Sequence, residues 1–428
     1  MQPDDLIIIS VDDHVVEPPN LFENHLPAKY KDIAPTIKHM DDGSDQWEFC
    51  GINIPNVGLN AVAGRPPEEY GREPTSFDEL RTGCYDVHER VKDMSAGGVL
   101  ASLCFPSMVA FAGRIFAQMD DKDAALALLR AYNDWHIDDW CGAYPGRFIP
   151  LSVTAIWDPE LAAQEIRRVA RKGCHAVSFV ENPVPLGYPS LHSDHWDPLW
   201  RACADEAMTV CMHIGSSSKL PSTAPDAPID VAITLTPINS LQAAADIVHS
   251  PIFRKFPTLK VALSEGGIGW VPYFLERLDH SFRVHHAWTG ADFGGRLPSE
   301  VFLDHVLLCY ISDGVGVKLA RDIGIGNITV EVDYPHSDTS WPNSPEVLWK
   351  DFANSDLTED EIHQITHRNA MKWFHFDPFT VRPPENATAG ALRAEVEGHD
   401  VSIQSRGKSG RNALRMGDLQ SIAASARA

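Results

Sequence analysis

Short runs of apolar residues recur along the chain, and each is separated from the next by a longer segment with apolar positions at helical spacing. Short continuous apolar runs are typical of strands buried on both faces, whereas apolar positions three or four residues apart are typical of amphipathic helices. The pattern predicts these strands: Leu6–Val11, Gly98–Phe105, Phe148–Val153, His175–Val180, Thr209–Ile214, Lys260–Leu263, Val306–Tyr310 and Ile328–Val332.

Helical patterns stand between and after these strands: Tyr85–Ala96, Asp121–Gly142, Pro159–Lys172, Trp196–Glu206, Ser240–Phe253, a region that begins near Gly269, Val317–Ile323 and Thr358–Phe374. Apolar strands that alternate with amphipathic helices predict a parallel sheet with helices over it. About eight such units predict a (β/α)8 TIM barrel, and a doubly wound sheet is the alternative. No glycine-rich phosphate-binding motif follows the first strand, which disfavours a nucleotide-binding form of that alternative.

Two segments fall outside this alternation. Residues 30–81 are rich in Pro, Gly, Asn and acidic residues, with a candidate hairpin around Trp47–Asn53. We interpret them as an insertion after the first strand that forms a lid or an interface. The polar residues 383–428 are expected to be a peripheral C-terminal extension. The domain prediction is therefore one barrel over residues 1–382, followed by this extension.

Composition and charge narrow the classes of partner. The 428 residues are 44% hydrophobic and carry a formal net charge of −23, from 36 basic and 59 acidic side chains. Such an acidic chain is not expected to bind nucleic acid or an anionic membrane. No apolar run approaches the length of a membrane span, and no signal peptide pattern is present. The eight cysteines are scattered without a CxxC pair, which indicates reduced thiols and a cytoplasmic protein.

Acidic and imidazole side chains gather where four of the predicted strands end. In a TIM barrel the catalytic groups come from the C-terminal ends of the strands, so these side chains are expected to share one mouth. The first strand runs into a triplet of two acids and a histidine, and the fifth, sixth and eighth strands contribute the others. The residues are Asp12, Asp13, His14, His213, Glu265, Asp333 and His336.

The spacing within the first triplet indicates a metal site. Side chains alternate along a strand, so Asp12 and His14 face one way and Asp13 faces the other. Together with His213 and Asp333 they form a mixed nitrogen and oxygen set, which suits zinc, manganese or iron rather than calcium. Each residue alone also has a structural explanation, such as an aspartate that caps a turn or a core histidine bonded to backbone. Their joint occurrence at strand ends favours the metal site.

Four segments resemble a known family. The segments "VDDHVVEPP", "VCMHIG", "LSEGGIGWVPYFLERLD" and "VEVDYPHSDTSWPNS" stand in the same order as in the amidohydrolase-2 branch of the amidohydrolase superfamily. This branch includes the aminocarboxymuconate-semialdehyde decarboxylase-like enzymes. The resemblance runs from about Leu6 to Phe376 and implies a metal-dependent (β/α)8 barrel. It also implies that Asp12, His14, His213 and Asp333 are metal ligands.

Two positions depart from the family pattern. Many relatives carry His-x-His in the first strand, and decarboxylase-like members carry Glu-x-His, whereas this chain has Asp12-x-His14. A carboxylate there shifts the expected single divalent ion toward manganese without excluding zinc. Relatives often have a histidine after the sixth strand, where this chain has Glu265. Glu265 is either the general acid or base, which requires a raised pKa for the acid role, or a carboxylate that stabilises a helix N-terminus.

Two reactions remain open at this point. The resemblance favours nonoxidative decarboxylation of an aromatic or unsaturated carboxylic acid, with Glu265 or His336 as proton donor. The alternative is hydrolysis of an amide, lactone or C–C bond by a metal-bound water, with Asp333 or Glu265 as base. A barrel that has lost its metal and acts as a binding protein is a third hypothesis, and the intact ligand set argues against it.

Residues around the same mouth complete the prediction. Trp270 and Trp341 are candidates for an apolar wall against a substrate ring, and Glu17 is a candidate support for His14. The partner is expected to be a small-molecule substrate. A homodimer is expected because closed symmetric oligomers are common.

Overall fold

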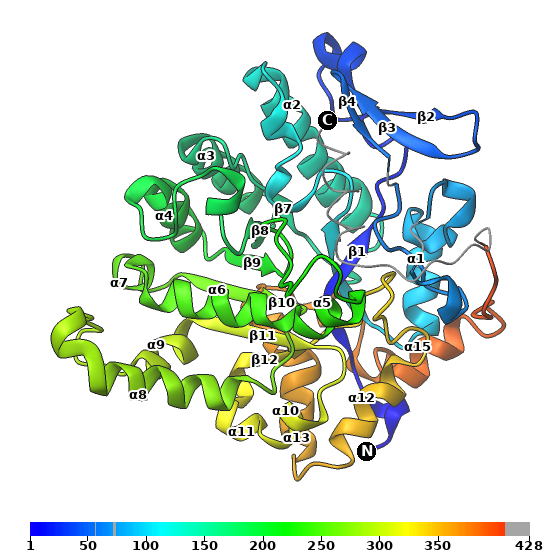
Figure 1. Ribbon diagram of the computed structural model, residues 1–428. Coiled ribbons are helices and arrows are strands. Elements are labelled where there is room, and N and C mark those ends of the chain that lie inside the picture. The colour runs from blue at the N-terminus through cyan, green and yellow to red at the C-terminus, as the bar shows by residue number, and fades with distance from the viewer. Residues whose placement is uncertain (56, 72–73, 407–428) are drawn as a thin grey trace.

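The structure is a computed structural model that describes residues 1–55, 57–71 and 74–406. At its centre is a sheet with the strand order β6-β5-β1-β12-β11-β10-β9-β8-β7, in which every pairing is parallel (Figure 1). Its strands are β1 (Ile9–Val15), β5 (Ala101–Pro106), β6 (Phe148–Ile149), β7 (Ser152–Val153), β8 (Ala176–Val180), β9 (Thr209–His213), β10 (Lys260–Ser264), β11 (Val306–Tyr310) and β12 (Ile328–Val330).

The two strands at the ends of this order close the sheet. β6 pairs with β5, β7 pairs with β8, and only Pro150 and Leu151 separate β6 from β7 in the chain. Proline has no backbone N–H and cannot donate to the sheet ladder, so an interruption at this point follows from the sequence. The two pieces act as one bent strand, which makes the sheet a closed barrel of the (β/α)8 type. The predicted TIM barrel is confirmed.

Helices surround this barrel (Figure 1), and aspartate caps start several of them. Asp86, Asp121 and Asp158 each accept two backbone N–H groups at the first turn of α1, α2 and α3. The helices are α1 (Val87–Ala96), α2 (Lys122–Asp134), α3 (Pro159–Ala170), α4 (Asp197–Asp205), α5 (Ile229–Leu235), α6 (Pro237–His249), α7 (Ile252–Lys255), α8 (Val271–Thr289), α9 (Pro298–His305), α10 (Gly314–Lys318), α11 (Ala320–Ile323), α12 (Ser344–Phe352), α13 (Glu359–His363), α14 (Asn369–Trp373) and α15 (Ala389–Glu395).

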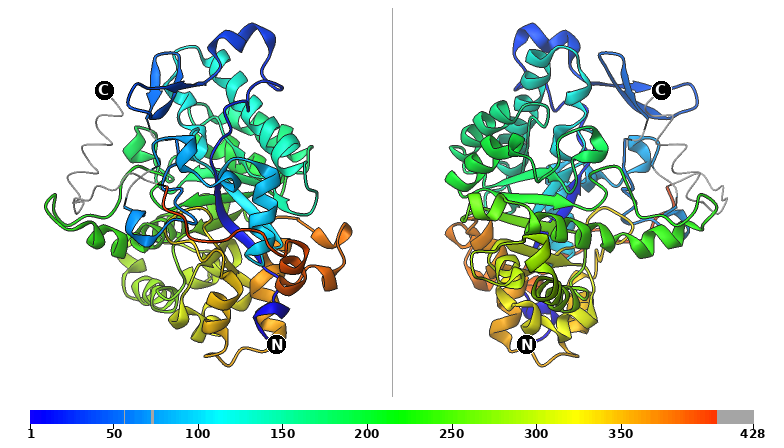
Figure 2. Two further views of the ribbon diagram at one scale, coloured as in Figure 1. Left: turned by 90° about the vertical axis from the view of Figure 1, so that its right-hand side faces the viewer. Right: turned by 60° about the vertical axis from the view of Figure 1, so that its left-hand side comes forward.

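The insertion after β1 carries a small antiparallel sheet of its own. Its strands are β2 (Thr36–His39), β3 (Asp45–Phe49) and β4 (Ile52–Ile54), and it lies at one end of the molecule, away from the N-terminus (Figure 2). β3 and β4 form the expected hairpin through Cys50 and Gly51, both with positive φ, as a tight two-residue hairpin turn requires. Further along, the N–H groups of Val62 and Ala63 donate to the carbonyl of Pro335. The insertion therefore contacts the loop after β12.

The described part of the C-terminal extension packs on the barrel and on the insertion. In α15, Leu392 is fully buried, and Arg393 pairs with Glu346 of α12 at 2.6 Å. Beyond α15, the N–H of Gln404 donates to the carbonyl of Gly64 in the insertion. The part of the extension from residue 407 onward lies outside the described residues.

Within residues 1–55, 57–71 and 74–406, one helical run is long and apolar enough to span a membrane. It is Ile229–His249, formed by α5 and α6, with a mean hydropathy of 1.2 and 39% of the window buried. The expectation that no run approaches this length was therefore wrong at this place. The run is found where two short helices follow each other directly, which the sequence pattern did not indicate. Core helices of soluble proteins meet the same criterion, so this run alone does not indicate a membrane protein.

Candidate metal centre

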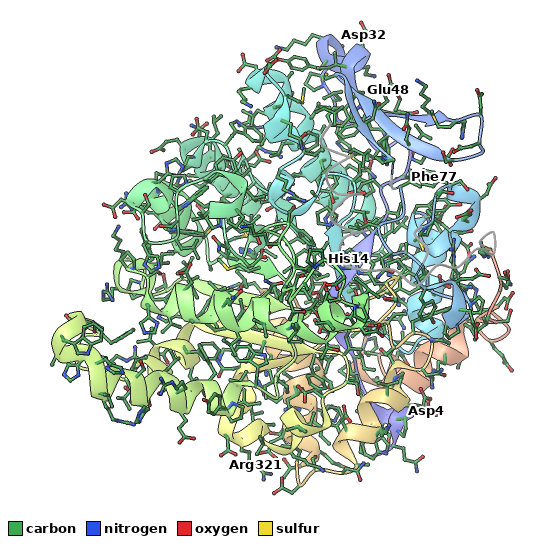
Figure 3. The ribbon with its side chains drawn as sticks, viewed as in Figure 1. Asp4, His14, Asp32, Glu48, Phe77 and Arg321 are labelled. Carbon is green, nitrogen blue, oxygen red and sulfur yellow. The ribbon has the colours of Figure 1, made fainter. Side chains whose placement is uncertain are left out.

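The acid and histidine triplet of β1 lies in the middle of the barrel (Figure 3). All seven residues of β1 are buried, so each polar side chain in it needs a partner. Asp13 turns to one side, where it accepts hydrogen bonds from Ser102 Oγ and from the N–H of Tyr334. Asp12 and His14 turn to the other side. The alternation of side chains along a strand places them there, as predicted.

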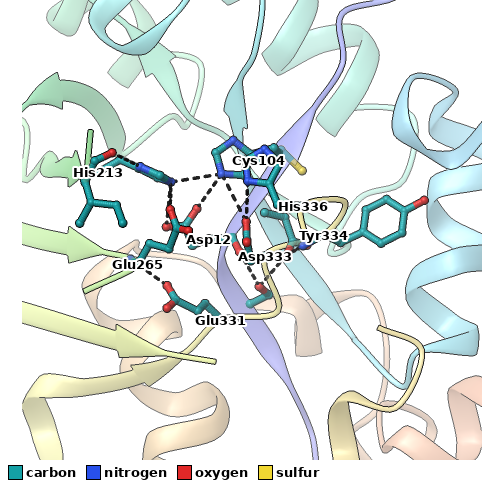
Figure 4. Close-up of polar contacts among 12 residues, drawn as sticks. Asp12, Cys104, His213, Glu265, Glu331, Asp333, Tyr334 and His336 are labelled. Carbon is teal, nitrogen blue, oxygen red and sulfur yellow. Dashed lines mark hydrogen bonds and ion pairs between the residues drawn. The ribbon is translucent and has the colours of Figure 1, made fainter. Parts of the chain in front are cut away.

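The four expected ligands lie together in this structure. His14 Nε2 and His213 Nε2 are 3.2 Å apart. Asp12 Oδ1 lies 3.4 Å from His14 Nε2, and Asp12 Oδ2 lies 3.5 Å from His213 Nε2. Asp333 Oδ1 lies 3.6 Å from His14 Nε2 (Figure 4). These atoms come from β1, the end of β9 and the loop after β12, and they converge on one point.

Two acids reach this point from an unusual backbone. Glu265 has φ of 61° and Asp333 has φ of 56°, in the left-handed region that non-glycine residues rarely adopt. The N–H of Asp333 donates to the carbonyl of Asp12, and the N–H of Glu265 donates to the carboxylate of Glu331 at 3.1 Å. These bonds hold the two turns in place. As a result, Glu265 Oε2 lies 3.1 Å from His213 Nε2 (Figure 4).

His336 completes the cluster. Its Nδ1 lies 2.9 Å from Asp333 Oδ1, and its ring lies against that of His14 with 3.8 Å between centroids. His213 is oriented by its own backbone environment, because its Nδ1 lies 2.7 Å from the carbonyl of Ile214. A proton on Nδ1 satisfies that carbonyl and leaves Nε2 free to face the cluster.

Burial and mutual repulsion perturb the protonation of this cluster. Burial raises the pKa of Asp12 well above its ordinary value, and repulsion from Glu331, Glu265 and Asp333 adds to the shift. The pKa of Asp333 is raised for the same two reasons. Burial lowers the pKa of His213 to about 3 and that of His14 well below 6.5, so both imidazoles are neutral. Neutral imidazoles are the form that binds a metal ion, and the raised pKa values of the two carboxyl groups reflect crowded negative charge that a bound cation would offset.

The hydrogen-bond partners fit a cation. Asp12 is fully buried, yet neither of its carboxylate oxygens accepts a hydrogen bond. Asp333 Oδ2 also accepts none, whereas Asp333 Oδ1 lies 2.9 Å from His336 Nδ1. A buried carboxylate without a donor is costly unless a positive charge faces it. Carboxylate and imidazole ligands in this proportion suit a divalent transition ion. The described residues are therefore consistent with one divalent metal ion, and two overlapping buried groups could hold it: Asp12, His14 and His213, or His14, Asp333 and His336.

The structure does not bring the two predicted tryptophans into this cluster. The indole N–H of Trp270 donates to the carbonyl of Gly266, and its ring packs against Phe274. Trp341 is buried, and its N–H donates to the carbonyl of Asp93. Their predicted role at the substrate is without support from these contacts.

Glu17 does not support His14 either. Its carboxylate accepts the N–H groups of Ser107 and Met108 in the loop after β5, at 3.1 and 2.7 Å.

Sequence reasoning missed two kinds of residue near the metal centre. Glu331 is buried and accepts the N–H of Glu265, and its position directly after an apolar run that leads to Asp333 was a usable signal. Phe105 and Phe111 lie against the histidines: the ring of Phe111 stacks on His213 at 4.5 Å. Phe111 belongs to a loop without a recognisable pattern, so the sequence offered no signal for it.

Comparison with known proteins identifies the family to which this chain is similar. The family model described as "Amidohydrolase" matches residues 77–376. The chain is 28% identical over 322 residues to the gamma-resorcylate decarboxylase of Polaromonas sp. strain JS666, which covers 70% of this chain and 90% of that protein.

Solved structures show the same fold. The 5-carboxyvanillate decarboxylase from Sphingomonas paucimobilis is 22% identical with a TM-score of 0.60, covering 87% of this chain and 100% of that one. The dihydroxybenzoic acid decarboxylase from Polaromonas sp. JS666, solved with manganese and the inhibitor 2-nitroresorcinol, is 18% identical with a TM-score of 0.53. That match covers 88% of this chain and 97% of that one.

Proposed function

This chain belongs to the amidohydrolase family, and from that premise we propose that it is a metal-dependent decarboxylase of a hydroxylated aromatic carboxylic acid. The observation that carries the proposal is the buried cluster of acids and imidazoles at the C-terminal ends of the barrel strands, in which neither carboxylate oxygen of Asp12 accepts a hydrogen bond. The similarity to gamma-resorcylate decarboxylase over most of both chains supports decarboxylation as the reaction. The substrate class follows from the same similarity.

The ion would be held by Asp12, His14, His213 and Asp333. When bound, it supplies positive charge to the carboxylate of the substrate and to a neighbouring hydroxyl oxygen. Two carboxylates among the four ligands favour a hard ion, so manganese is proposed before zinc. The manganese of a solved relative supports this choice.

The chain itself must supply a proton. Decarboxylation breaks the bond between the ring carbon and its carboxylate, and that carbon takes up one proton as CO2 leaves. We place Glu265 as the donor because its side chain is 21% exposed and so reaches the substrate side, whereas Asp333 is fully enclosed. Burial, and then repulsion from Asp333, raises the pKa of Glu265 well above 4.5, so its carboxyl group holds a proton at higher pH than usual. His336, beside Asp333, is the alternative donor.

Hydrolysis of an amide, lactone or C–C bond is the second candidate. The observation that favours it is the position of Glu265 beside the proposed ligand His213, at 3.1 Å from its Nε2, because a carboxylate beside the metal centre could take a proton from a bound water. Asp333 is the other candidate base in this mechanism. The similarity to decarboxylases places this function second.

One experiment separates the two reactions. Purified protein is freed of metal, reloaded with Mn²⁺ or Zn²⁺, and incubated with 2,6-dihydroxybenzoate, 5-carboxyvanillate, an N-acyl amino acid and a lactone. Mass spectrometry is expected to show loss of CO2 from a hydroxybenzoate, only in the reloaded enzyme. Addition of water without CO2 release would establish hydrolysis instead. No conversion of any aromatic acid by either reloaded form would overturn the proposal.

We further propose a cytoplasmic homodimer. All eight cysteines are free, and apart from the exposed Cys50 they are buried, which supports a reducing compartment. Light scattering of the purified protein tests the assembly, and a mass close to that of one chain would exclude the dimer.

A further inference from the structure

Phe111 is the aromatic side chain that stands over the metal centre from the loop after β5. Its ring stacks on His213 with 4.5 Å between centroids and 27° between planes, and it meets the ring of His14 edge-on at 6.3 Å. The two histidines are buried, whereas Phe111 is half-buried.

The loop holds Phe111 through a strained backbone. Ala110 on one side and Ala112 on the other have φ of 56° and 57°, although neither is glycine, and Gly113 follows with φ of 61°. Left-handed conformations at alanine cost about 1–3 kcal/mol each and persist only where the surroundings impose them. Two such residues directly flank Phe111, so the backbone on both sides of this side chain is held in a restricted conformation.

Buried groups of the barrel impose that conformation. Glu17, just after β1, is fully buried, and its two carboxylate oxygens accept the N–H groups of Ser107 and Met108 at the start of the loop. At the other side of Phe111, the N–H of Ala112 donates to Ser178 Oγ of β8 at 3.2 Å. The loop is therefore tied to two strands of the barrel, and Phe111 is fixed relative to the histidines.

We propose that Phe111 is the specificity-determining wall for the aromatic ring of the substrate, and that Glu17 is the residue that positions it. The proposal rests on the proposed function, since an acid bound at the cluster places its ring beside His213. Stacked or edge-to-face rings contribute about 0.5–1.5 kcal/mol beyond their area, so Phe111 selects planar aromatic acids over saturated ones.

Binding measurements test this without turnover. Manganese-loaded protein is titrated by calorimetry with 2,6-dihydroxybenzoate and with the saturated analogue 2-hydroxycyclohexanecarboxylate. Phe111→Leu keeps apolar volume but removes the ring. It is expected to weaken binding of the aromatic acid by about 5–10-fold and that of the saturated acid by less than about twofold. Phe111→Tyr keeps the ring and is expected to bind both acids like the wild type.

The control is Phe282→Leu in α8, a half-buried ring that packs on His286 at 4.9 Å and is not part of the cluster. Metal content and thermal unfolding are measured for every variant. If a folded and metal-loaded Phe111→Leu protein loses affinity equally for both acids, or loses none, the proposal that Phe111 forms the wall is overturned. Binding of both acids by the wild type without CO2 release would overturn the proposed function and leave the wall standing.

The role of Glu17 is tested by a double-mutant cycle. Glu17→Gln releases the loop, so it is expected to lose the same preference for the aromatic acid. In the double variant with Phe111→Leu, Glu17→Gln is expected to weaken binding of the aromatic acid by less than about a further twofold, because both substitutions remove the same interaction. Full additivity of the two losses would show that Glu17 acts elsewhere and would overturn its positioning role.

Discussion

Asp12 combines complete burial with two carboxylate oxygens that accept no hydrogen bond, so its free energy in the fold depends on a cation. The first prediction concerns metal content. In the double variant Asp12→Ala/His213→Ala, the affinity for Mn²⁺ and Zn²⁺ is expected to fall by at least about 100-fold, since removal of groups that only support a ligand already costs 10–100-fold. Elemental analysis after dialysis measures this.

The control uses the same residue types at exposed positions. Asp230→Ala/His249→Ala, on α5 and α6, is expected to keep the metal content of the wild type. Retention of metal by the Asp12→Ala/His213→Ala protein would show that these residues are not the ligands.

The second prediction concerns Glu265. Glu265→Gln keeps the shape of the side chain but removes the transferable proton, so kcat is expected to fall by about 10²–10⁴. Metal content is expected to remain unchanged, because the ligand set does not need this side chain. Glu265→Asp restores a carboxyl group at shorter reach and is expected to recover part of the rate. Wild-type activity in Glu265→Gln would leave Glu265 with only its structural role at the turn before α8.

For single residues, the sequence predicted which way side chains point along a strand better than it predicted backbone conformation. The alternation along a strand was enough to separate Asp12 and His14 from Asp13. The left-handed backbone of Glu265 and Asp333 was not predictable, because a distant carboxylate and a neighbouring strand impose it. The position of Phe111 depends on similar long-range bonds, from Glu17 and Ser178, which the sequence alone does not indicate.

At the scale of the elements, the end of the first strand shows where pattern reasoning failed. The expected strand ended at Val11 because charge follows it, whereas β1 continues to Val15. The strand can continue through the buried Asp13 because Ser102 Oγ and the N–H of Tyr334 donate hydrogen bonds to its carboxylate. The other strands lie close to their predicted ranges, since uninterrupted apolar runs leave few alternatives.

The third prediction concerns a helical element. His136 lies in the π-helical segment Trp135–Cys141 that extends α2, and burial lowers its pKa from 6.5 to about 4. Between these pH values the unfolded chain binds a proton that the folded chain does not. The stability due to neutral His136 is therefore complete above pH 6.5 and is lost as the pH falls toward 4, by on the order of 3 kcal/mol.

Urea unfolding between pH 8 and pH 5 measures this effect. His136→Gln cannot titrate, so its stability is expected to fall less with decreasing pH than that of the wild type. The exposed His280→Gln is expected to follow the wild type. Parallel curves for the wild type and His136→Gln would contradict the assignment of this pH dependence to His136.

At the scale of the whole molecule, one buried carboxylate joins distant parts of the chain. Asp93 of α1 is 1% exposed and accepts hydrogen bonds from Arg81 at the end of the insertion, Tyr334 in the loop after β12, and His399 in the C-terminal segment. Tyr334 directly follows Asp333. The insertion, the extension and the metal centre are therefore linked through this one carboxylate.

The last prediction follows from this link. Asp93→Asn leaves the partly buried guanidinium of Arg81 without its counter-charge. The free energy of unfolding is therefore expected to fall by about 1.5–3 kcal/mol, the cost of losing a hydrogen bond to a charged group. Because the turn of Asp333 loses its support from Tyr334, the affinity for Mn²⁺ is expected to fall in the same variant. Glu89→Gln on the same helix removes an exposed pair with Lys92 and is expected to change stability by less than about 1 kcal/mol. Equal effects of the two substitutions in urea unfolding, or unchanged metal affinity in Asp93→Asn, would show that the insertion and the extension do not support the metal centre.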